Sequence, residues 1–297
     1  MQEPQLDRTE SEISEPQAAP RYPAARQVWG ITVFTILAVM GAGLLALDAL
    51  GKVTLVLSEV AILVPAVVFT RVTGFSSRAL FRLHPIGGRT VSFSVVVGLS
   101  LPMVANAVDT ALESRFPMPE SLKQAMEAML NIQGPGDLVW IVSGLVIGAA
   151  VCEELFFRGF LQSTLEWRHG PFWAIVLASL TFGLVHINPW WFVSILLAGV
   201  VCGLLAYTSG SVYPGIIVHG MNNGLSLVIL NAKQSEQFRW MGALEDVSWP
   251  TALVSGVVLL ASLVWFMKQK RLSGGFPFRG NDTPLSSPRM RGDTEGG

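Results

Sequence analysis

Chemically active side chains recur at a spacing of four residues in three apolar stretches of this chain. The pairs are Glu154 with Arg158, Phe182 with His186, and His219 with Asn223. Residues four apart share one face of an α-helix, so each pair should point to one place in the interior. An ionisable group inside an apolar, membrane-length helix costs roughly 2.5 to 3.5 kcal/mol, and such groups are usually paired or functional. The spacing therefore predicts a polar site enclosed by helices.

The two adjacent glutamates have different expected partners. An α-helix turns about 100° per residue, so Glu153 and Glu154 face different directions. Glu154 stands four residues before Arg158, in the favourable acid-before-base order for an ion pair. Glu153 is left without a partner in its own helix. A carboxylate held away from bulk water is suited to act as a general base near neutral pH. We interpret Glu153 in that role, with Glu154 and Arg158 as structural support.

Two histidines and an asparagine could complete a hydrolytic site around Glu153. His186 can hold a water molecule together with the glutamate, while Phe182 lies one turn away on the same helix face and supports it. His219 and Asn223 can donate hydrogen bonds to the oxyanion of a tetrahedral intermediate. A base, a water molecule and oxyanion donors favour hydrolysis of an acyl bond, a peptide bond above all.

A metal-dependent alternative stays open at this point. Glu153, His186 and His219 would make a three-ligand site for a divalent metal such as zinc, with a fourth position left for water. The sequence has no H-E-x-x-H zinc helix and no G-x-S-x-G nucleophile elbow. We rank the metal-free site first and expect no certain cofactor.

The elements that must position these residues are membrane-length helices. The chain has 297 residues, of which 51% are hydrophobic and 14% charged, whereas soluble domains have about 25% charged residues. Its mean hydropathy is +0.50. This composition predicts an all-α, polytopic integral membrane helix bundle of about eight transmembrane helices. The expected spans are 28–47, 53–72, 90–112, 138–168 (which continues beyond the membrane), 172–187, 191–207, 212–230 and 250–267.

Charged residues outside these spans indicate the orientation of the chain. Residues 71–89 carry four arginines and no acid, and three basic residues follow the last span. By the positive-inside rule we expect both termini in the cytoplasm. We also expect the bundle to lie in the plasma membrane of a bacterium. The expected organisation is a disordered N-terminal tail at 1–26, a transmembrane bundle at 27–268 with its core at about 138–230, and a flexible C-terminal tail at 269–297.

The loop between the third and fourth expected spans contains apolar residues at a helical period. They are Leu122, Ala125, Met126, Met129 and Leu130. This pattern predicts an amphipathic helix on the membrane surface. Such a helix either packs against the ends of the spans or covers the site.

Three motifs in chain order resemble the set found in the CAAX protease and bacteriocin-processing family, also called Abi proteins or type II CAAX endopeptidases. They are E-E-x-x-x-R at 153–158, F-x-x-x-H at 182–186 and H-x-x-x-N at 219–223. These proteins are described as glutamic intramembrane proteases. The resemblance implies an all-helical membrane fold with a cavity open to the cytoplasm. It also implies that Glu153 activates water with His186, that His219 and Asn223 form the oxyanion hole, and that the activity is an endopeptidase for CAAX-type or leader and signal peptides.

Two other functional classes are compatible with the same polar residues. A non-enzymatic bacteriocin-immunity or scaffold protein would use them only to lock helices together. A transporter would relay protons through Glu59, Glu153 and Glu154 and would favour an internal inverted repeat, which the sequence does not show. We instead interpret Glu59 as a helix-packing hydrogen bond in preference to a cavity-wall residue. A net charge of −1 without a basic stripe argues against nucleic-acid binding. The expected partners are the lipid bilayer and a membrane-associated peptide or protein, with the oligomeric state left open.

Overall fold

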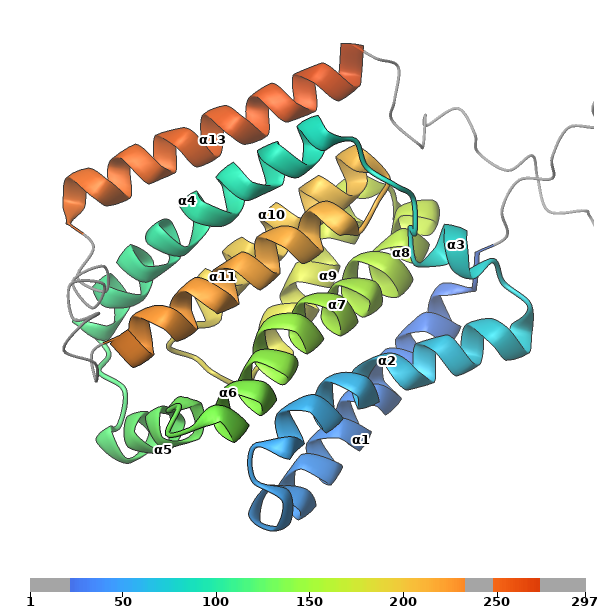
Figure 1. Ribbon diagram of the computed structural model, residues 1–297. Coiled ribbons are helices and arrows are strands. Elements are labelled where there is room, and N and C mark those ends of the chain that lie inside the picture. Colours follow the sequence, from blue (N-terminus) through green and yellow to red (C-terminus); the bar gives the residue numbers. More distant parts are fainter. Residues whose placement is uncertain (1–21, 233–247, 273–297) are drawn as a thin grey trace, which may run out of the picture.

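The computed structural model describes residues 22–232 and 248–272, and every regular element within these ranges is helical (Figure 1). In chain order the elements are α1 (Ala25–Leu50), α2 (Val53–Thr73), α3 (Ser77–Leu80), α4 (Gly88–Glu113), α5 (Glu120–Leu130), α6 (Pro135–Ile141), η1 (Val142–Gly148), α7 (Ala149–Glu154), η2 (Leu155–Leu161), α8 (Gln162–His169), α9 (Pro171–Val185), α10 (Phe192–Ser209), α11 (Tyr213–Ala232) and α13 (Trp249–Leu272). The predicted all-α fold class is confirmed for the described residues. Residues 1–21 and 273–297, which hold most of the two predicted tails, lie outside those ranges.

Five helical units in the described part of the chain are long and apolar enough to cross a membrane. They are Val53–Thr73, Gly88–Glu113, Pro135–His169, Phe192–Ser209 and Trp249–Gln269. Two further apolar helices, Ala25–Gly41 and α9, are shorter. α11 falls outside the five because His219 and neighbouring asparagines lower its hydropathy. The structure therefore supports an integral membrane helix bundle but does not confirm the predicted count of about eight spans.

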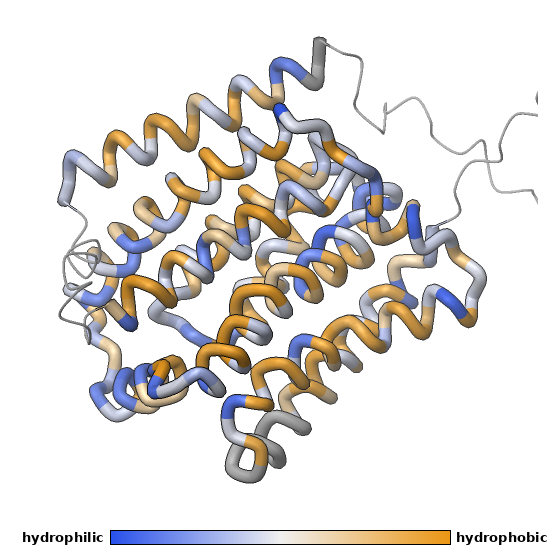
Figure 2. The backbone as a smooth tube through the Cα atoms, viewed as in Figure 1, coloured by the Kyte–Doolittle hydropathy of each residue, from blue (hydrophilic) through white to orange (hydrophobic). Residues whose placement is uncertain are grey.

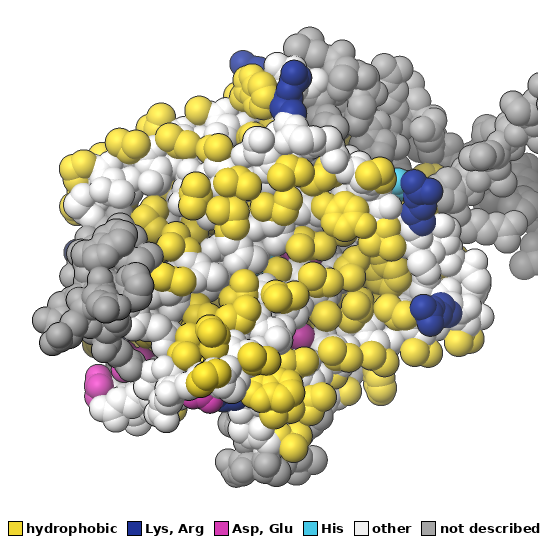
Figure 3. Space-filling model, in the orientation of Figure 1, with side chains coloured by type: hydrophobic (Ala, Val, Ile, Leu, Met, Phe, Trp, Pro, Cys, Tyr) yellow, Lys and Arg dark blue, Asp and Glu magenta, His cyan; other side chains and the backbone are white. Residues whose placement is uncertain are grey.

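The helices are arranged around the long central unit Pro135–His169 (Figure 1). α1 and α2 form a hairpin against one side of this unit, and α11 lies on its other side, followed by α4 and α13. α9 and α10 pack against each other behind α7 and α11. The apolar residues Val64, Val68, Leu253 and Leu260 are exposed on α2 and α13. Both helices are hydrophobic along much of their length (Figure 2), and hydrophobic side chains cover much of the surface in Figure 3. Helices that face lipid are expected to expose such surfaces.

The central unit contains two π-helical segments, η1 and η2, on either side of α7, which holds both glutamates. π-Turns are rare and occur frequently at functional sites. Gly144 lets η1 lie close to α2, because a Cβ atom there would be 2.6 Å from Cβ of Leu55. A Cβ atom at Gly148 would be 3.3 Å from Cβ of Glu59. The two glycines, four residues apart, leave room for the backbone of α2, which therefore packs beside α7. The helix predicted over 138–168 is thus present, with two π-turns that its apolar pattern does not indicate.

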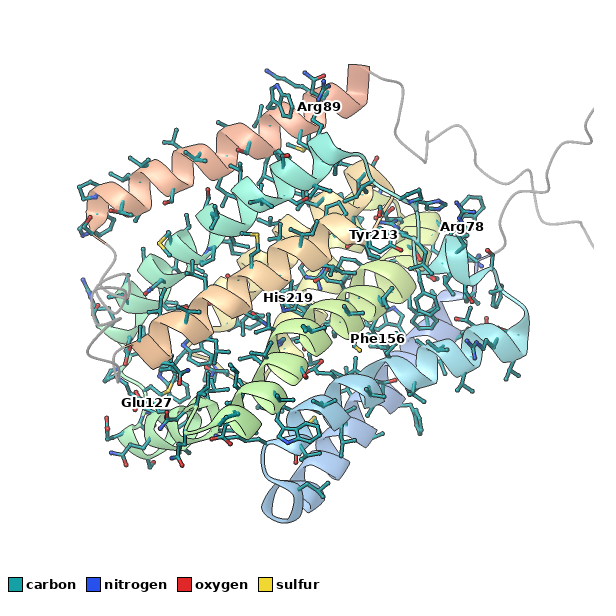
Figure 4. All side chains as sticks on the ribbon, in the orientation of Figure 1. Arg78, Arg89, Glu127, Phe156, Tyr213 and His219 are labelled. Carbon is teal, nitrogen blue, oxygen red and sulfur yellow. The ribbon has the colours of Figure 1, made fainter. Side chains whose placement is uncertain are left out.

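One end of the bundle, here called the arginine-bearing end, is formed by α3, the α8–α9 turn and the α10–α11 turn. These segments meet at Arg82, whose carbonyl accepts a hydrogen bond from the Val212 amide and whose guanidinium pairs with buried Glu166. Arg168 donates hydrogen bonds to the backbone that precedes α1. The start of α1, the end of α2 and the start of α4 therefore share this end, which carries Arg78 and Arg89 (Figure 4).

The opposite end, here called the α5 end, contains the α1–α2 turn, α5 and the start of α6. Lys52 in that turn forms an ion pair of 2.9 Å with Asp137 of α6. Asn231 in the last turn of α11 donates to the carbonyl of Leu130 at the end of α5. The amphipathic helix predicted from residues 122–130 is confirmed as α5.

α9 is too short to reach the α5 end. Its 15 residues rise about 22 Å, which is less than the roughly 30 Å thickness of a hydrocarbon core. The 35 residues of the central unit rise about 50 Å. The α9–α10 turn therefore lies part-way along the bundle, where Asn188 Nδ2 is 4.0 Å from Sδ of Met126 on α5. α5 is therefore in contact with the α9–α10 turn.

Candidate active site

A cavity of about 500 Å³ lies between α2, α4, α5, α7, α9, α10 and α11. Every side chain that the sequence predicts for the site lines it: Glu153, Glu154, Arg158, Phe182, His186, His219 and Asn223. They come from the central unit, the end of α9 and α11, and His219 lies near the middle of the bundle (Figure 4). The structure therefore brings the whole predicted set together.

Glu154 is completely buried and forms the predicted ion pair. Its Oε1 atom is 3.0 Å from Nη1 of Arg158, a side chain that is only 1% exposed. Arg158 also donates to the carbonyl of Gly199 at 3.3 Å, and its guanidinium carbon lies 4.3 Å from the ring centroid of Phe182. Gly215 lets α11 approach this pair, because a Cβ atom there would be 2.5 Å from Oε2 of Glu154. These contacts make Glu154 and Arg158 a rigid floor for the cavity.

His219 lies between the two glutamates. Its Nδ1 atom is 3.2 Å from Oε1 of Glu154, and its Nε2 atom is 3.7 Å from Oε2 of Glu153. An ionised carboxylate only accepts hydrogen bonds, so the Glu154 contact assigns a proton to Nδ1 of His219. The ring also meets Phe182 edge-on, with centroids 5.8 Å apart. His219 is thus anchored on one carboxylate and directed toward the other, an arrangement that spacing within α11 alone does not indicate.

Glu153 is 7% exposed, and its Oε2 atom has no hydrogen-bond partner among the described residues. The side chain lines the main cavity and also a smaller one of about 110 Å³ that lies against α1. His186 lines both cavities as well. The contacts of the two glutamates therefore differ: Glu154 is paired with Arg158, whereas Oε2 of Glu153 has no hydrogen-bond partner in the described part of the chain.

His186 stands immediately after the last residue of α9, at the point where the chain turns. Its Nδ1 atom is 2.7 Å from the carbonyl oxygen of Phe182, so Nδ1 donates there and Nε2 is left for another partner. Ile187 has a positive φ of 49°, an uncommon conformation for a β-branched residue. Asn188 then accepts hydrogen bonds from two successive backbone amides, which fixes the turn. The ring of His186 is consequently oriented by its own helix end.

Asn223 is held by the first π-helical segment. Its Nδ2 atom donates to the carbonyl of Leu145 in η1 at 2.9 Å. The neighbouring Asn222 lines the cavity and donates to Oδ1 of Asn223 at 3.3 Å. A primary amide has two N–H donors, so Asn223 keeps one for another acceptor.

Glu59 on α2 also lines the cavity, and its Oε2 atom finds no hydrogen-bond donor in the described ranges. The interpretation of Glu59 as a helix-packing hydrogen bond is therefore wrong, because the side chain is a cavity-wall residue. The sequence contains a signal for this placement. Glu59 has no basic residue four positions before or after it, so it lacks the local partner that Glu154 has.

The positions of these side chains bear on whether they could hold a metal. Across residues 22–232 and 248–272, no three His, Cys, Asp or Glu side chains converge as ligands. Glu153, His186 and His219 share the cavity, and the bond from Nδ1 of His186 to a backbone carbonyl leaves its Nε2 free. In the described residues these three side chains are therefore in one cavity but are not gathered as a set of metal ligands.

Comparison with known proteins finds a family model that matches the central part of the chain. Residues 135–225 match the family model of type II CAAX prenyl endopeptidase Rce1-like proteins. No curated protein and no solved structure matches the chain. The matched segment runs from the first residue of α6 into α11, so it contains all seven predicted site residues, whereas Glu59 and the walls formed by α4 and α5 lie outside it.

Proposed function

We propose, from the membership of residues 135–225 in the type II CAAX prenyl endopeptidase Rce1-like family, that this chain is a membrane endopeptidase. It would cleave peptide bonds of membrane-associated proteins or peptides, in CAAX-type or leader and signal-peptide processing. The observation that carries the proposal is Glu153, a buried carboxylate with an unpaired oxygen in one cavity with His186, His219 and Asn223.

In the proposed reaction, Glu153 takes a proton from a water molecule held between it and His186. The ring of His186 is oriented in advance, because Nδ1 is engaged by a carbonyl and Nε2 stays available to the water. The hydroxide attacks the carbonyl carbon of the scissile bond, and Glu153 then returns the proton to the leaving amine. A positioned general base of this kind contributes about 10²- to 10⁴-fold in rate.

His219 and Asn223 are the proposed donors to the oxyanion. Asn223 offers the amide N–H that Leu145 does not use. Donation from Nε2 of His219 requires the doubly protonated imidazole, and the two neighbouring carboxylates balance its charge. Removal of one oxyanion donor lowers kcat by about 10²- to 10³-fold in enzymes of known mechanism.

The test is peptide cleavage by the purified full-length protein in detergent or lipid. Glu153→Ala and His186→Ala should abolish cleavage while the proteins remain folded, because neither side chain holds the Glu154 ion pair. Glu120→Ala on exposed α5 is a matched control for loss of a carboxylate and should keep wild-type activity. Full activity in Glu153→Ala would contradict the proposal.

The non-enzymatic immunity or scaffold alternative makes a different prediction. It expects no cleavage by the wild-type protein and a loss of stability on substitution of any residue of the polar cluster. Comparison of the membrane peptides that accumulate in cells carrying wild-type and Glu153→Ala protein decides between the two. A peptide that accumulates only with the variant identifies the substrate, whereas identical peptide sets favour the alternative.

A further inference from the structure

We infer that the cavity takes its substrate from the α5 end of the bundle, and that this end faces away from the cytoplasm. The substrate would then be a peptide segment exposed on the non-cytoplasmic side of the membrane. That the cavity takes a peptide substrate rests on the proposed peptidase function. The direction in which the cavity opens is inferred from geometry and charge alone.

The mouth of the cavity is at the α5 end. Glu113 at the end of α4 and Lys123 on α5 line the cavity and form an ion pair of 3.8 Å, with side chains 49% and 47% exposed. Met126 and Glu127 on the next turn of α5 line it too, and Glu127 marks this end in Figure 4. The cavity therefore extends from the buried glutamates to solvent-exposed residues of α5.

The other end of the cavity is closed by packed side chains. Beyond Glu154 and Arg158 the central unit is buried on all sides, as Phe160 and Gln162 show. Gln162 donates to the carbonyl of Gly203 and to Glu166, which pairs with Arg82. No cavity-lining residue belongs to α3, α8 or the α10–α11 turn. A peptide consequently has no path to Glu153 from the arginine-bearing end.

The two ends also differ in charge. Most of the basic side chains in Figure 3 gather toward the arginine-bearing end, whereas acidic side chains gather near α5. The arginine-bearing end carries Arg71, Arg78, Arg82, Arg89 and Arg168. In contrast, residues 109–137 at the α5 end carry five acids and two basic residues, and Lys52 from the α1–α2 turn adds a third basic residue there. The positive-inside rule places the basic end in the cytoplasm, and the mouth of the cavity then opens on the other side.

Two expectations drawn from the sequence cannot both hold in this structure. Cytoplasmic termini follow from the basic loops, and a cavity open to the cytoplasm follows from the family resemblance. The closed arginine-bearing end makes them incompatible, because the first described residues and the basic loops share the end that the cavity does not reach. The charge distribution belongs to this chain itself, and we therefore take it as the guide to the substrate's side.

The first experiment measures which side of the membrane the cavity meets. Ser226→Cys places a thiol at an exposed position of the cavity wall, and Arg78→Cys places one at the arginine-bearing end. Both are made in a Cys152→Ala/Cys202→Ala background and treated with a membrane-impermeant maleimide. The Ser226→Cys protein should be labelled in intact cells and the Arg78→Cys protein only after lysis. The reverse pattern would overturn the inference.

The second experiment measures the side from which cleavage occurs. A water-soluble, quenched-fluorescent peptide library is added to sealed right-side-out and inside-out vesicles that contain the wild-type or Glu153→Ala protein. Cleavage that depends on Glu153 should occur in right-side-out vesicles and be lost in inside-out ones, and the opposite result refutes the inference. Absence of cleavage in both vesicle types and in detergent would instead refute the peptidase function, while the maleimide pattern still decides the direction of the opening.

Discussion

Glu153 and Glu154 are adjacent, carry the same functional group and are both buried. The same substitution should nevertheless destabilise the protein at Glu154 and remove catalysis, with little change in stability, at Glu153. We consider Glu→Gln, which keeps the shape and removes the charge. The side chain of Glu154 is 0% exposed and has two charged contacts, Arg158 at 3.0 Å and His219 at 3.2 Å. Oε2 of Glu153 has no hydrogen-bond partner within the described ranges.

The expected magnitudes follow from these contacts. Glu154→Gln leaves the guanidinium of Arg158 buried without its counter-charge, and breaking a buried ion pair in this way costs about 3–5 kcal/mol. At 1.4 kcal/mol per factor of ten, this loss is about 10²-fold or more in the folding equilibrium. Oε2 of Glu153 has no hydrogen-bond partner in the described residues and only a longer contact, 3.7 Å, with Nε2 of His219, so we expect Glu153→Gln to change the stability by at most about 1 kcal/mol. Catalysis should respond differently, because Glu153→Gln removes the proposed base.

The assay is equilibrium unfolding in mixed micelles, followed by the fluorescence of the nine tryptophans, alongside peptide cleavage. Arg158→Met should be destabilising by itself, because it leaves Glu154 without its arginine. The double variant Glu154→Gln/Arg158→Met should be more stable than the sum of the single changes predicts, with a coupling of about 0.5–3 kcal/mol. Equal destabilisation by the Glu153 and Glu154 variants, or additivity in the double variant, would refute the division into a structural and a working carboxylate.

Three further predictions concern α11 and the cofactor. Gly215→Ala should destabilise the protein by about 1–3 kcal/mol and reduce activity, because the new Cβ atom would lie 2.5 Å from Oε2 of Glu154. Gly220→Ala on the same helix, whose nearest contact would be 3.5 Å, is the control and should be tolerated in thermal unfolding and cleavage assays. Asn223→Leu should lower kcat by about 10²- to 10³-fold and stability by about 1 kcal/mol through the lost bond to Leu145, so a variant with wild-type kcat would remove Asn223 from the oxyanion hole. Treatment with a metal chelator should leave cleavage unchanged, and loss of activity that zinc restores would return the metal-dependent mechanism to consideration.

Features that depend on local spacing could be predicted from the sequence. The Glu154–Arg158 pair and the apolar face of α5 each follow from residues three or four positions apart. The convergence of three helices on one cavity could also be predicted, because unpaired polar groups in apolar helices need a common interior. These signals are sufficient for the fold class and for the seven side chains that the sequence assigns to the cavity.

Features that depend on contacts between distant segments could not be predicted. His219 binds Glu154 across 65 positions, and Asn223 binds Leu145 across 78. The π-helical segment that contains Leu145 is packed against α2, so its backbone conformation reflects a neighbour that local propensity does not include. Glu59 reaches the cavity through the same packing of α2. The count of about eight spans is not confirmed for the described residues, because Ala25–Gly41 and α9 are short and α11 is less apolar.

The closed floor of the cavity determines where the membrane voltage falls. Water in the cavity can reach Glu153 from the α5 end, so little of the potential drops along that path. Most of it falls across the packed side chains between Arg158 and Arg82, where Phe160 and Leu161 are fully buried. A unit charge that crosses a whole membrane exchanges about 2.3 kcal/mol with each 100 mV. Protons exchanged between water and Glu153 do not cross this packed region, so the membrane potential neither drives nor opposes their transfer. For the same reason the bundle can admit water to its centre without conducting ions.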